Sequence, residues 1–492
     1  MKKNTLSILI GTLSLSAASS LAAKQPVTKP NLVFIFDDQH SFDMLGCYGN
    51  KQVKTPNLDK FAQQGIRFTN CFSNCPVSTP FRGLLMTGQH SLSNGTIKND
   101  LPLLPGHGKK FAEVLRDAGY NTAYIGKWHL LGGERNRSIP KGEMRYGFDE
   151  LFLSNNCTTD FRAGHCFYWN EKGKKVVFDK WEVDGQTDQA LDYLDARKET
   201  KQPFALFISW HPPHNSSEKI MSNGDKHYTY NHVPDDYLSL YNIDSIHVRP
   251  GTKNSPEIRE MYRDHYANIT AIDKAFGDLM SKLNELGLDS NTLVVFTSDH
   301  GDMLEFKNYY GAKSVAYDYS GRTPLIMRLP GKLEANSSTK LLLGSLDLMP
   351  SILGLLKLNV PKEVQGKNLA KAILTKNENA VDYIPVWNLA GVGYRGVITR
   401  DYIYCRQKKE AKASFQNILI NRNTDPYQLN NQFDNPKMAD VKAELWKLTQ
   451  TSMASFGDEF WEWKDVLNAA DLNEWQYNTT KRPIDILRNS KK

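Results

Sequence analysis

The sequence contains little cysteine and, after its first residues, no long apolar run. Six cysteines among 492 residues are too few for a disulfide-rich scaffold, and their spacings match no zinc-binding template. Cys157 and Cys166 are the local candidate for a disulfide, with buried free thiols as an equal alternative. No later segment reaches the roughly 20 apolar residues of a membrane-spanning helix. These absences exclude disulfide-knotted scaffolds, zinc fingers and multi-span membrane proteins.

The composition is that of an ordinary folded protein. Hydrophobic residues make up 40% and charged residues 23% of the chain, which is long enough for one large domain and a smaller one. The formal net charge of +7 suits an anionic substrate but is common on solvated surfaces. We expect no nucleic-acid partner, and the sequence leaves the oligomeric state open.

The first 22 residues have the pattern of a secretory signal peptide. Lys2 and Lys3 supply the positive start, residues 6–18 are mainly apolar, and residues 20–22 form a small-x-small cleavage site. The alternative, a transmembrane anchor, needs a longer apolar run. The sequence therefore predicts a periplasmic or secreted protein.

Apolar runs alternate with helical patterns along most of the chain. This alternation predicts an α/β fold, with a large, mostly parallel but mixed sheet sandwiched by helices. The expected strands are residues 31–36, 121–125, 204–209, 293–297 and 324–329, and the expected helices are residues 55–61, 109–117 and 257–286.

The composition changes near residue 380. Val386, Val397 and Tyr402 indicate short antiparallel strands. We therefore expect a catalytic α/β domain at residues 23–380 and a C-terminal α+β subdomain with a small antiparallel sheet at residues 381–492.

Polar residues follow four of the predicted strands. In sheets of this kind the catalytic and ligand-binding residues lie at the carboxyl ends of the strands. The residues concerned are Asp37 and Asp38, Lys127 and His129, His211 and His214, and Asp299 and His300. We expect these groups to form one site.

Carboxylates at two of these strand ends favour a metal site. Asp37 and Asp38 would repel each other unless a cation or a proton lay between them, and Asp299 offers a third carboxylate. Either acidic pair alone could instead cap a helix or solvate a turn. His300 is a softer ligand than calcium prefers, so the identity of the ion stays open.

The segment STPFRGLLMTG begins with Ser78. A serine before a proline is most often a turn residue. Here a helical segment follows, which points backbone N–H groups at an anion, and Arg82 lies one turn along on the same side.

Seven motifs in order resemble the formylglycine-dependent (type I) sulfatases of the alkaline phosphatase superfamily, in their serine form. The resemblance covers residues 30 to the C-terminus and implies an alkaline phosphatase-like fold. It is carried by PNLVFIFDDQH, STPFRGLLMTG, GYNTAYIGKWHL, SWHPPH, TLVVFTSDHGD, GAKSVAYDYSGRTPLI and NTDPYQLNN. Phe81 replaces the small residue often found before the motif arginine.

The resemblance assigns a role to each candidate residue. It implies that Ser78 is oxidised to formylglycine, whose hydrate lies on a metal, usually calcium (Ca2+) and less often magnesium (Mg2+). The implied metal ligands are Asp37, Asp38, Ser78, Asp299 and His300.

Positive charge and proton transfer involve five further residues. Arg82, Lys127 and Lys313 would neutralise the sulfate ester. His214 would protonate the leaving oxygen and His129 would remove the proton that expels sulfate, although these two roles could be exchanged. His211 is expected to be structural.

The predicted partners are a sulfated saccharide and a sulfatase-maturating enzyme. The serine motif favours a bacterial, oxygen-independent radical maturation enzyme acting on Ser78. Loops at residues 90–100, 155–169 and 216–248 should shape the sugar subsite, but the sugar, the sulfate position and endo- or exo-action stay open. The alternatives are a phosphate or phosphonate ester hydrolase of the same superfamily and a catalytically silent carbohydrate-binding protein.

Overall fold

The computed structural model describes residues 29–106, 108–220, 226–390, 393–407, 417–459 and Val466. The predicted signal peptide, residues 1–22, lies outside the described residues. Within them, no helix is both long and apolar enough to span a membrane.

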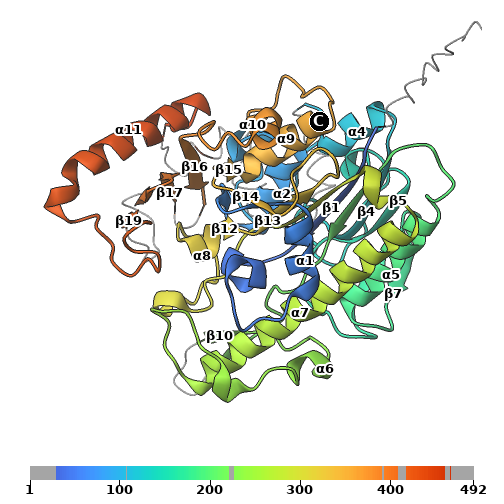
Figure 1. Cartoon of the computed structure of the whole chain (residues 1–492), viewed down its shortest axis with the longest axis horizontal. Coiled ribbons are helices and arrows are strands. Elements are labelled where there is room, and N and C mark those ends of the chain that lie inside the picture. The colour runs from blue at the N-terminus through green and yellow to red at the C-terminus, as the bar shows by residue number, and fades with distance from the viewer. Residues whose placement is uncertain are drawn as a thin grey trace, which may run out of the picture.

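A ten-stranded mixed sheet forms the centre of the molecule (Figure 1). Its strands, in order across the sheet, are β14 (Ser337–Thr339), β2 (Ile66–Phe68), β13 (Leu325–Arg328), β11 (Thr292–Ser298), β1 (Asn31–Asp37), β8 (Phe204–Ser209), β4 (Asn121–Lys127), β5 (Leu151–Asn155), β6 (Phe167–Trp169) and β7 (Lys175–Val177). The five strands from β11 to β5 in this order are parallel to one another. The strands on either side of them, β13 and β6, run antiparallel to β11 and β5.

Helices cover both faces of this sheet. The face with the longest helix carries α1 (Pro56–Gln64), α5 (Glu182–Asp195) and α7 (Pro256–Glu285). The opposite face carries α2 (Ser78–Thr87), α4 (Phe111–Asp117), α9 (Leu348–Leu355) and α10 (Ala370–Thr375). The shorter helices are α3 (Ser91–Asn94), α6 (Asp235–Leu238) and α8 (Asp318–Gly321).

Strand β1 shows why the continuous apolar pattern predicts a buried strand. Side chains alternate between the two faces of a strand. Phe34 and Phe36 pack into the core beneath α2 and α4, whereas Val33 and Ile35 pack into the core beneath α7. Both faces are covered, so every position is apolar.

Smaller sheets complete the molecule. They comprise β12–β3–β15 (Arg322–Thr323, Cys71–Phe72 and Leu343–Gly344), the hairpin β9–β10 (Ser217–Ile220 and Lys226–Thr229) and the antiparallel sheet β16–β17–β18–β19 (Tyr383–Asn388, Tyr394–Thr399, Tyr402–Gln407 and Ile418–Asn421). Helix α11 (Ala439–Ser455) packs on the last of these sheets. The predicted fold class, including the C-terminal antiparallel sheet, is confirmed.

Two local features concern the start of α1 and the cysteines. Thr55 precedes α1 but makes no side-chain cap, because its hydroxyl accepts the N–H of Gly46 and donates to Asp59. Cys157 and Cys166 form no disulfide, and all six cysteines are free thiols.

Candidate functional site

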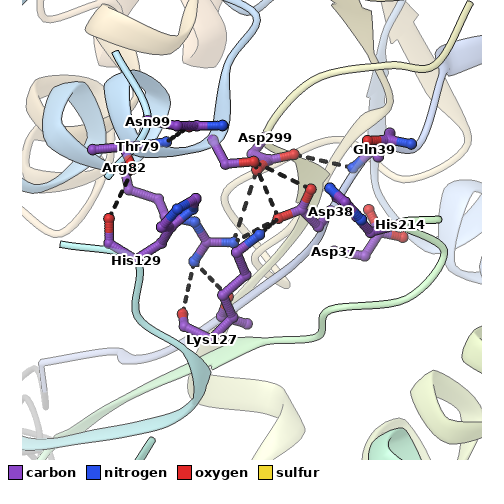
Figure 2. A network of polar contacts seen from close by, with 12 residues as sticks. Asp37, Asp38, Gln39, Thr79, Arg82, Asn99, Lys127, His129, His214 and Asp299 are labelled. Atoms are coloured by element: carbon purple, nitrogen blue, oxygen red, sulfur yellow. Dashed lines mark hydrogen bonds and ion pairs between the residues drawn. The ribbon is translucent and has the colours of Figure 1, made fainter. Parts of the chain in front are cut away.

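The carboxyl ends of β1, β4, β8 and β11 bring the predicted polar residues to one edge of the sheet (Figure 2). The parallel register places Asp37 opposite Ser298 and Gly126 opposite Ser209. The residues that follow these positions therefore meet in space, although Gln39 and Asp299, for example, are 260 positions apart in the chain. The residues that follow these strands thus lie at one edge of the sheet, and their role as one functional site stays a prediction.

Asp38, Asp299 and His300 form a buried cluster. One ligand atom from each lies within 4.8 Å of the others, and all three side chains are fully buried. The hydroxyl of Ser78 lies 3.1 Å from Nε2 of His300 and 3.3 Å from Oδ1 of Asp38. Ser78 thus starts helix α2 directly against the cluster.

Asp37 stands slightly apart from this cluster. Its Oδ2 lies 2.6 Å from Nδ1 of His40, and it is not among the residues whose ligand atoms lie within 4.8 Å of one another. Within the described part of the chain, its Oδ1 is buried without a hydrogen-bond partner, as is Oδ2 of Asp299. Buried carboxylate oxygens without donors are costly unless a cation is bound.

Electrostatics also favour a cation here. Burial and the neighbouring Asp38 raise the pKa of Asp299. The pKa of Asp38 is lowered even though burial opposes this, because Lys127 and His214 favour its charged form. The donor set, three carboxylates, one hydroxyl and one imidazole, fits a divalent ion that prefers oxygen ligands.

Arg82 and Lys127 are buried against the acids. Nζ of Lys127 lies 2.6 Å from Oδ2 of Asp38, and Nη2 of Arg82 lies 3.2 Å from the same oxygen. Arg82 is held by its Nη1, which donates to the carbonyl of Lys127 and to the hydroxyl of Ser209, each at 2.7 Å. This bracing fixes two positive charges beside the Ser78 hydroxyl.

Gly126 allows β4 to deliver Lys127. Its φ of +117° is unfavourable for side-chain-bearing residues, and a Cβ there would lie 2.0 Å from the carbonyl oxygen of Ser209. The close approach of β4 and β8 at this point therefore requires glycine.

Lys313 and His214 form a second buried basic pair. Nζ of Lys313 lies 3.1 Å from Nε2 of His214, whose Nδ1 lies 2.9 Å from the carbonyl of Asn215. Burial lowers the pKa of both groups, and the Lys313 charge lowers that of His214 further. Both side chains influence the pKa of Asp38, so the pair belongs to the same site.

His129 and His211 take different places. The carbonyl of His129 accepts the hydroxyl of Thr79 at 3.0 Å, which ties this loop to the residue after Ser78 (Figure 2). His211 is fully buried and its ring lies 5.4 Å from that of His214. Neither of its ring nitrogens has a hydrogen-bond partner among the residues that the structure describes.

The sequence did not predict several residues of the site. Ser209 and Tyr124 support Arg82 from within strands, where they look like ordinary core positions. Gln39 donates its backbone N–H to Oδ1 of Asp299 at 3.1 Å. Its position directly after two acids at a strand end was the one available signal.

Comparison with known proteins agrees with this geometry. Residues 30–358 match the sulfatase family, and residues 306–454 match the family described as N-sulphoglucosamine sulphohydrolase, C-terminal. An ulvan-active sulfatase of Formosa agariphila is 33% identical over 444 residues, covering 88% of this chain and 83% of that protein. An endo-4-O-sulfatase of Bacteroides thetaiotaomicron is 29% identical over 514 residues, covering 92% and 98%.

Solved structures show the same fold. A sulfatase structure from work on glycosaminoglycan metabolism by Bacteroides thetaiotaomicron superposes with a TM-score of 0.77 at 26% identity, covering 90% of this chain and 99% of that one. A phosphonate monoester hydrolase of Agrobacterium radiobacter shares the fold at a TM-score of 0.67 and 19% identity, covering 87% and 96%. The fold alone thus admits two chemistries, but the sequence matches are to sulfatases: the chain belongs to the sulfatase family, whose members are sulfuric ester hydrolases.

Proposed function

We propose that this protein removes sulfate from a sulfated saccharide, with a formylglycine made from Ser78 as its nucleophile. The observation that carries the proposal is the position of the Ser78 hydroxyl, 3.1 Å from Nε2 of His300 and 3.3 Å from Oδ1 of Asp38, at the start of α2. The names of the relatives in Formosa and Bacteroides support a glycan substrate.

The proposed metal site consists of Asp37, Asp38, Asp299 and His300, with the Ser78 position as the fifth ligand. We favour calcium, because four of these five residues offer oxygen ligands. When bound, the ion would supply Lewis-acid polarisation and neutralise charge on the ester.

The modification of Ser78 answers a chemical problem. A serine sulfate ester hydrolyses slowly. In a hydrated aldehyde, one hydroxyl can attack sulfur while the S–O bond to the alcohol breaks and the alcohol leaves. Deprotonation of the other hydroxyl then forms the carbonyl, as the C–O bond to the sulfate breaks and sulfate leaves. The residues of this chain then have to bind the anionic ester and move two protons.

Arg82, Lys127 and Lys313 supply the binding charge. The side chains of Arg82 and Lys127 already contact Asp38. The anionic oxygens of the ester would bind beside this carboxylate, at the proposed metal site. Donors fixed in advance stabilise the charge of the transition state without reorganising.

His214 and His129 are the proposed proton carriers. His214 lies beside Lys313, which can pass a proton to its Nε2, so this pair suits protonation of the leaving oxygen. His129 suits removal of the proton that releases sulfate. His211 lies beside this pair and remains an expected structural residue.

We further propose a periplasmic or secreted location and maturation by an anaerobic radical enzyme. Both follow from residues 1–22 and from serine, rather than cysteine, at position 78. A sample produced without that enzyme should be inactive for this reason alone.

The rival function is phosphate or phosphonate ester hydrolysis. Phosphatases of this superfamily usually assemble two metal ions. Among the described residues, Asp38, Asp299 and His300 are the one group of His, Cys, Asp and Glu side chains close enough together to hold an ion, which favours the single-metal sulfatase.

The deciding experiment uses protein co-produced with a maturation enzyme. Sulfate release should be measured on a panel of position-defined sulfated saccharides, beside matched phosphate esters. We expect sulfate esters to react faster and the Ser78 peptide to be short of two hydrogen atoms by mass. Ser78→Ala should abolish turnover, whereas Ser351→Ala, which alters a buried serine of α9, should not. Faster phosphate hydrolysis, or full activity with an unmodified Ser78, would overturn the proposal.

A further inference from the structure

Asp100 lies against the imidazole of His129. Nε2 of His129 is 3.2 Å from Oδ1 of Asp100, and the ring is almost completely buried. The other ring nitrogen, Nδ1, is buried, makes no hydrogen bond to a nitrogen or oxygen atom of the described residues, and belongs to a ring that interacts with the thiol of Cys157. The carboxylate therefore selects the tautomer in which Nε2 carries the hydrogen and Nδ1 keeps its lone pair.

Asp100 is itself held in place from two sides. Arg135 donates to both carboxylate oxygens, from Nε at 3.2 Å and from Nη2 at 2.9 Å. Burial works against the charged form, but the hydrogen bonds from His129 and Arg135 outweigh it and hold the pKa of Asp100 well below its usual range. Asp100 is thus a fixed anion at neutral pH.

Backbone groups also link Asp100 to His129, through the hydroxyl of Thr79. The N–H of Asp100 donates to the Thr79 hydroxyl at 3.3 Å, and that hydroxyl donates to the carbonyl of His129 at 3.0 Å. Asp100 and His129 both adopt left-handed backbone, at φ of +64° and +56°. Such conformations persist where surrounding contacts enforce them, and they gather at functional sites.

We propose that Asp100 is the positioning residue that makes His129, and not His214, the proton acceptor of the sulfate-release step. The proton would end on Nδ1 of His129, and the positive charge formed on the ring would face Asp100. The two ring nitrogens of His214 instead contact the carbonyl of Asn215 and the Lys313 cation, and this cation opposes a second positive charge. This inference rests on the proposed function. It assigns the proton-acceptor role to His129 and the proton-donor role to His214, which the sequence left exchangeable.

A purely structural role for Asp100, as anchor for Arg135, predicts a different outcome. Arg135 is about half exposed, and loss of an exposed ion pair costs little stability and leaves kcat unchanged. The variants must therefore separate the effect on His129 from the effect on Arg135.

The first test reads the tautomer without catalysis. Protein with unmodified Ser78, labelled with 15N-histidine, should show His129 with hydrogen on Nε2, its signals assigned by their loss in His129→Gln. In Asp100→Asn we expect a shift toward the Nδ1–H tautomer or a mixture. An unchanged His129 spectrum in Asp100→Asn would overturn the inference whatever the enzyme hydrolyses.

The second test uses the matured enzyme with 4-nitrophenyl sulfate. We expect Asp100→Asn to lower kcat by about 10²-fold or more, in the range of general-base contributions, and KM to fall with it, because the covalent sulfate intermediate accumulates. Release of 4-nitrophenol should become a burst of one equivalent followed by slow turnover. Asp100→Glu should recover part of the loss.

The controls separate the possible failures. Asp149→Asn removes a surface carboxylate paired with Arg116 at 2.9 Å and should match the parent. If the parent hydrolyses sulfate esters but Asp100→Asn behaves like Asp149→Asn, the inference fails and the proposed function stands. If the matured parent hydrolyses no sulfate ester, the proposed function fails, and the tautomer experiment still decides the role of Asp100.

Discussion

Lys313 and His214 meet through a nitrogen–nitrogen contact of 3.1 Å, with both side chains buried beside Asp38. A cation next to an imidazole disfavours imidazolium, so burial and Lys313 together hold the pKa of His214 well below its usual range. Neutral His214 accepts a hydrogen bond from the ammonium of Lys313. The pair can therefore deliver a proton only where negative charge develops, as on a leaving oxygen.

The proton-donor role of His214 predicts a dependence on the leaving group. We expect His214→Ala to lower kcat/KM by about 10²–10⁴-fold on sulfated saccharides, whose alkoxide leaves poorly without a proton. On 4-nitrophenyl sulfate, whose phenolate leaves unaided, the loss should be much smaller. His129→Ala should reduce kcat on both substrates. Equal losses for His214→Ala on both substrates would contradict the assignment.

The acidic cluster predicts an unusual effect of cation on stability. In cation-free protein the ionised Asp299 is disfavoured by burial and by Asp38, so Asp299→Asn should leave the thermal midpoint unchanged or higher. With calcium at 100 times its dissociation constant, the parent should gain about 2.7 kcal/mol, and the variant should lose most of this gain.

Scanning calorimetry with and without chelator checks this prediction. Asp289→Asn, a paired carboxylate 2.9 Å from Arg328, serves as the control and should keep the calcium response. A destabilised Asp299→Asn that still responds fully to calcium would argue against a metal site there.

The buried thiol of Cys157 should ionise at lower pH than the buried thiol of Cys166. Burial opposes ionisation, but the interactions with His129, which include a hydrogen bond, and the charge of Lys127 outweigh it and lower the pKa of Cys157 to about 6, whereas burial raises that of Cys166 to about 12. The reactive thiolate forms above the pKa. Iodoacetamide at pH 7 should therefore alkylate Cys157 well before Cys166, with a rate that rises through pH 6 and then levels off.

Peptide mapping by mass spectrometry measures both rates. Lys127→Met should move the rise in rate at Cys157 to higher pH. Similar labelling of the two cysteines at pH 7 would show that the thiol of Cys157 is not ionised.

Gly126 should tolerate no side chain. In Gly126→Ala the new methyl group would overlap the carbonyl of Ser209 and adopt a φ of +117°, which should cost about 2 kcal/mol or more and displace Lys127. Gly119→Ala is the matched control, because its φ is also positive, at +88°, but its Cβ would meet open space. Thermal midpoints and kcat should fall further for Gly126→Ala, and equal effects of the two substitutions would contradict the close-contact argument.

Periodicity and local chemistry were enough to predict much of the architecture. The run at residues 204–209 coincides with β8, and the pattern at residues 257–286 falls within one residue of α7. Strands buried on both faces and a long amphipathic helix leave local signatures in the order of residue types. For the same reason the strand-end rule identified Asp38, Lys127, His214 and Asp299 as neighbours before any fold was known.

What the sequence by itself determined is therefore the set of strands and the residues that follow them. Tertiary structure alone decided that Asp37 turns toward His40, that Ser209 braces Arg82, and that Asp100 meets His129. These contacts join loops and strands with no shared periodicity. Each depends on the direction of the backbone and on which polar group lies close to the buried side chain. Side-chain type shows what a residue can do, but the neighbour that selects its protonation state is set only when the chain is packed.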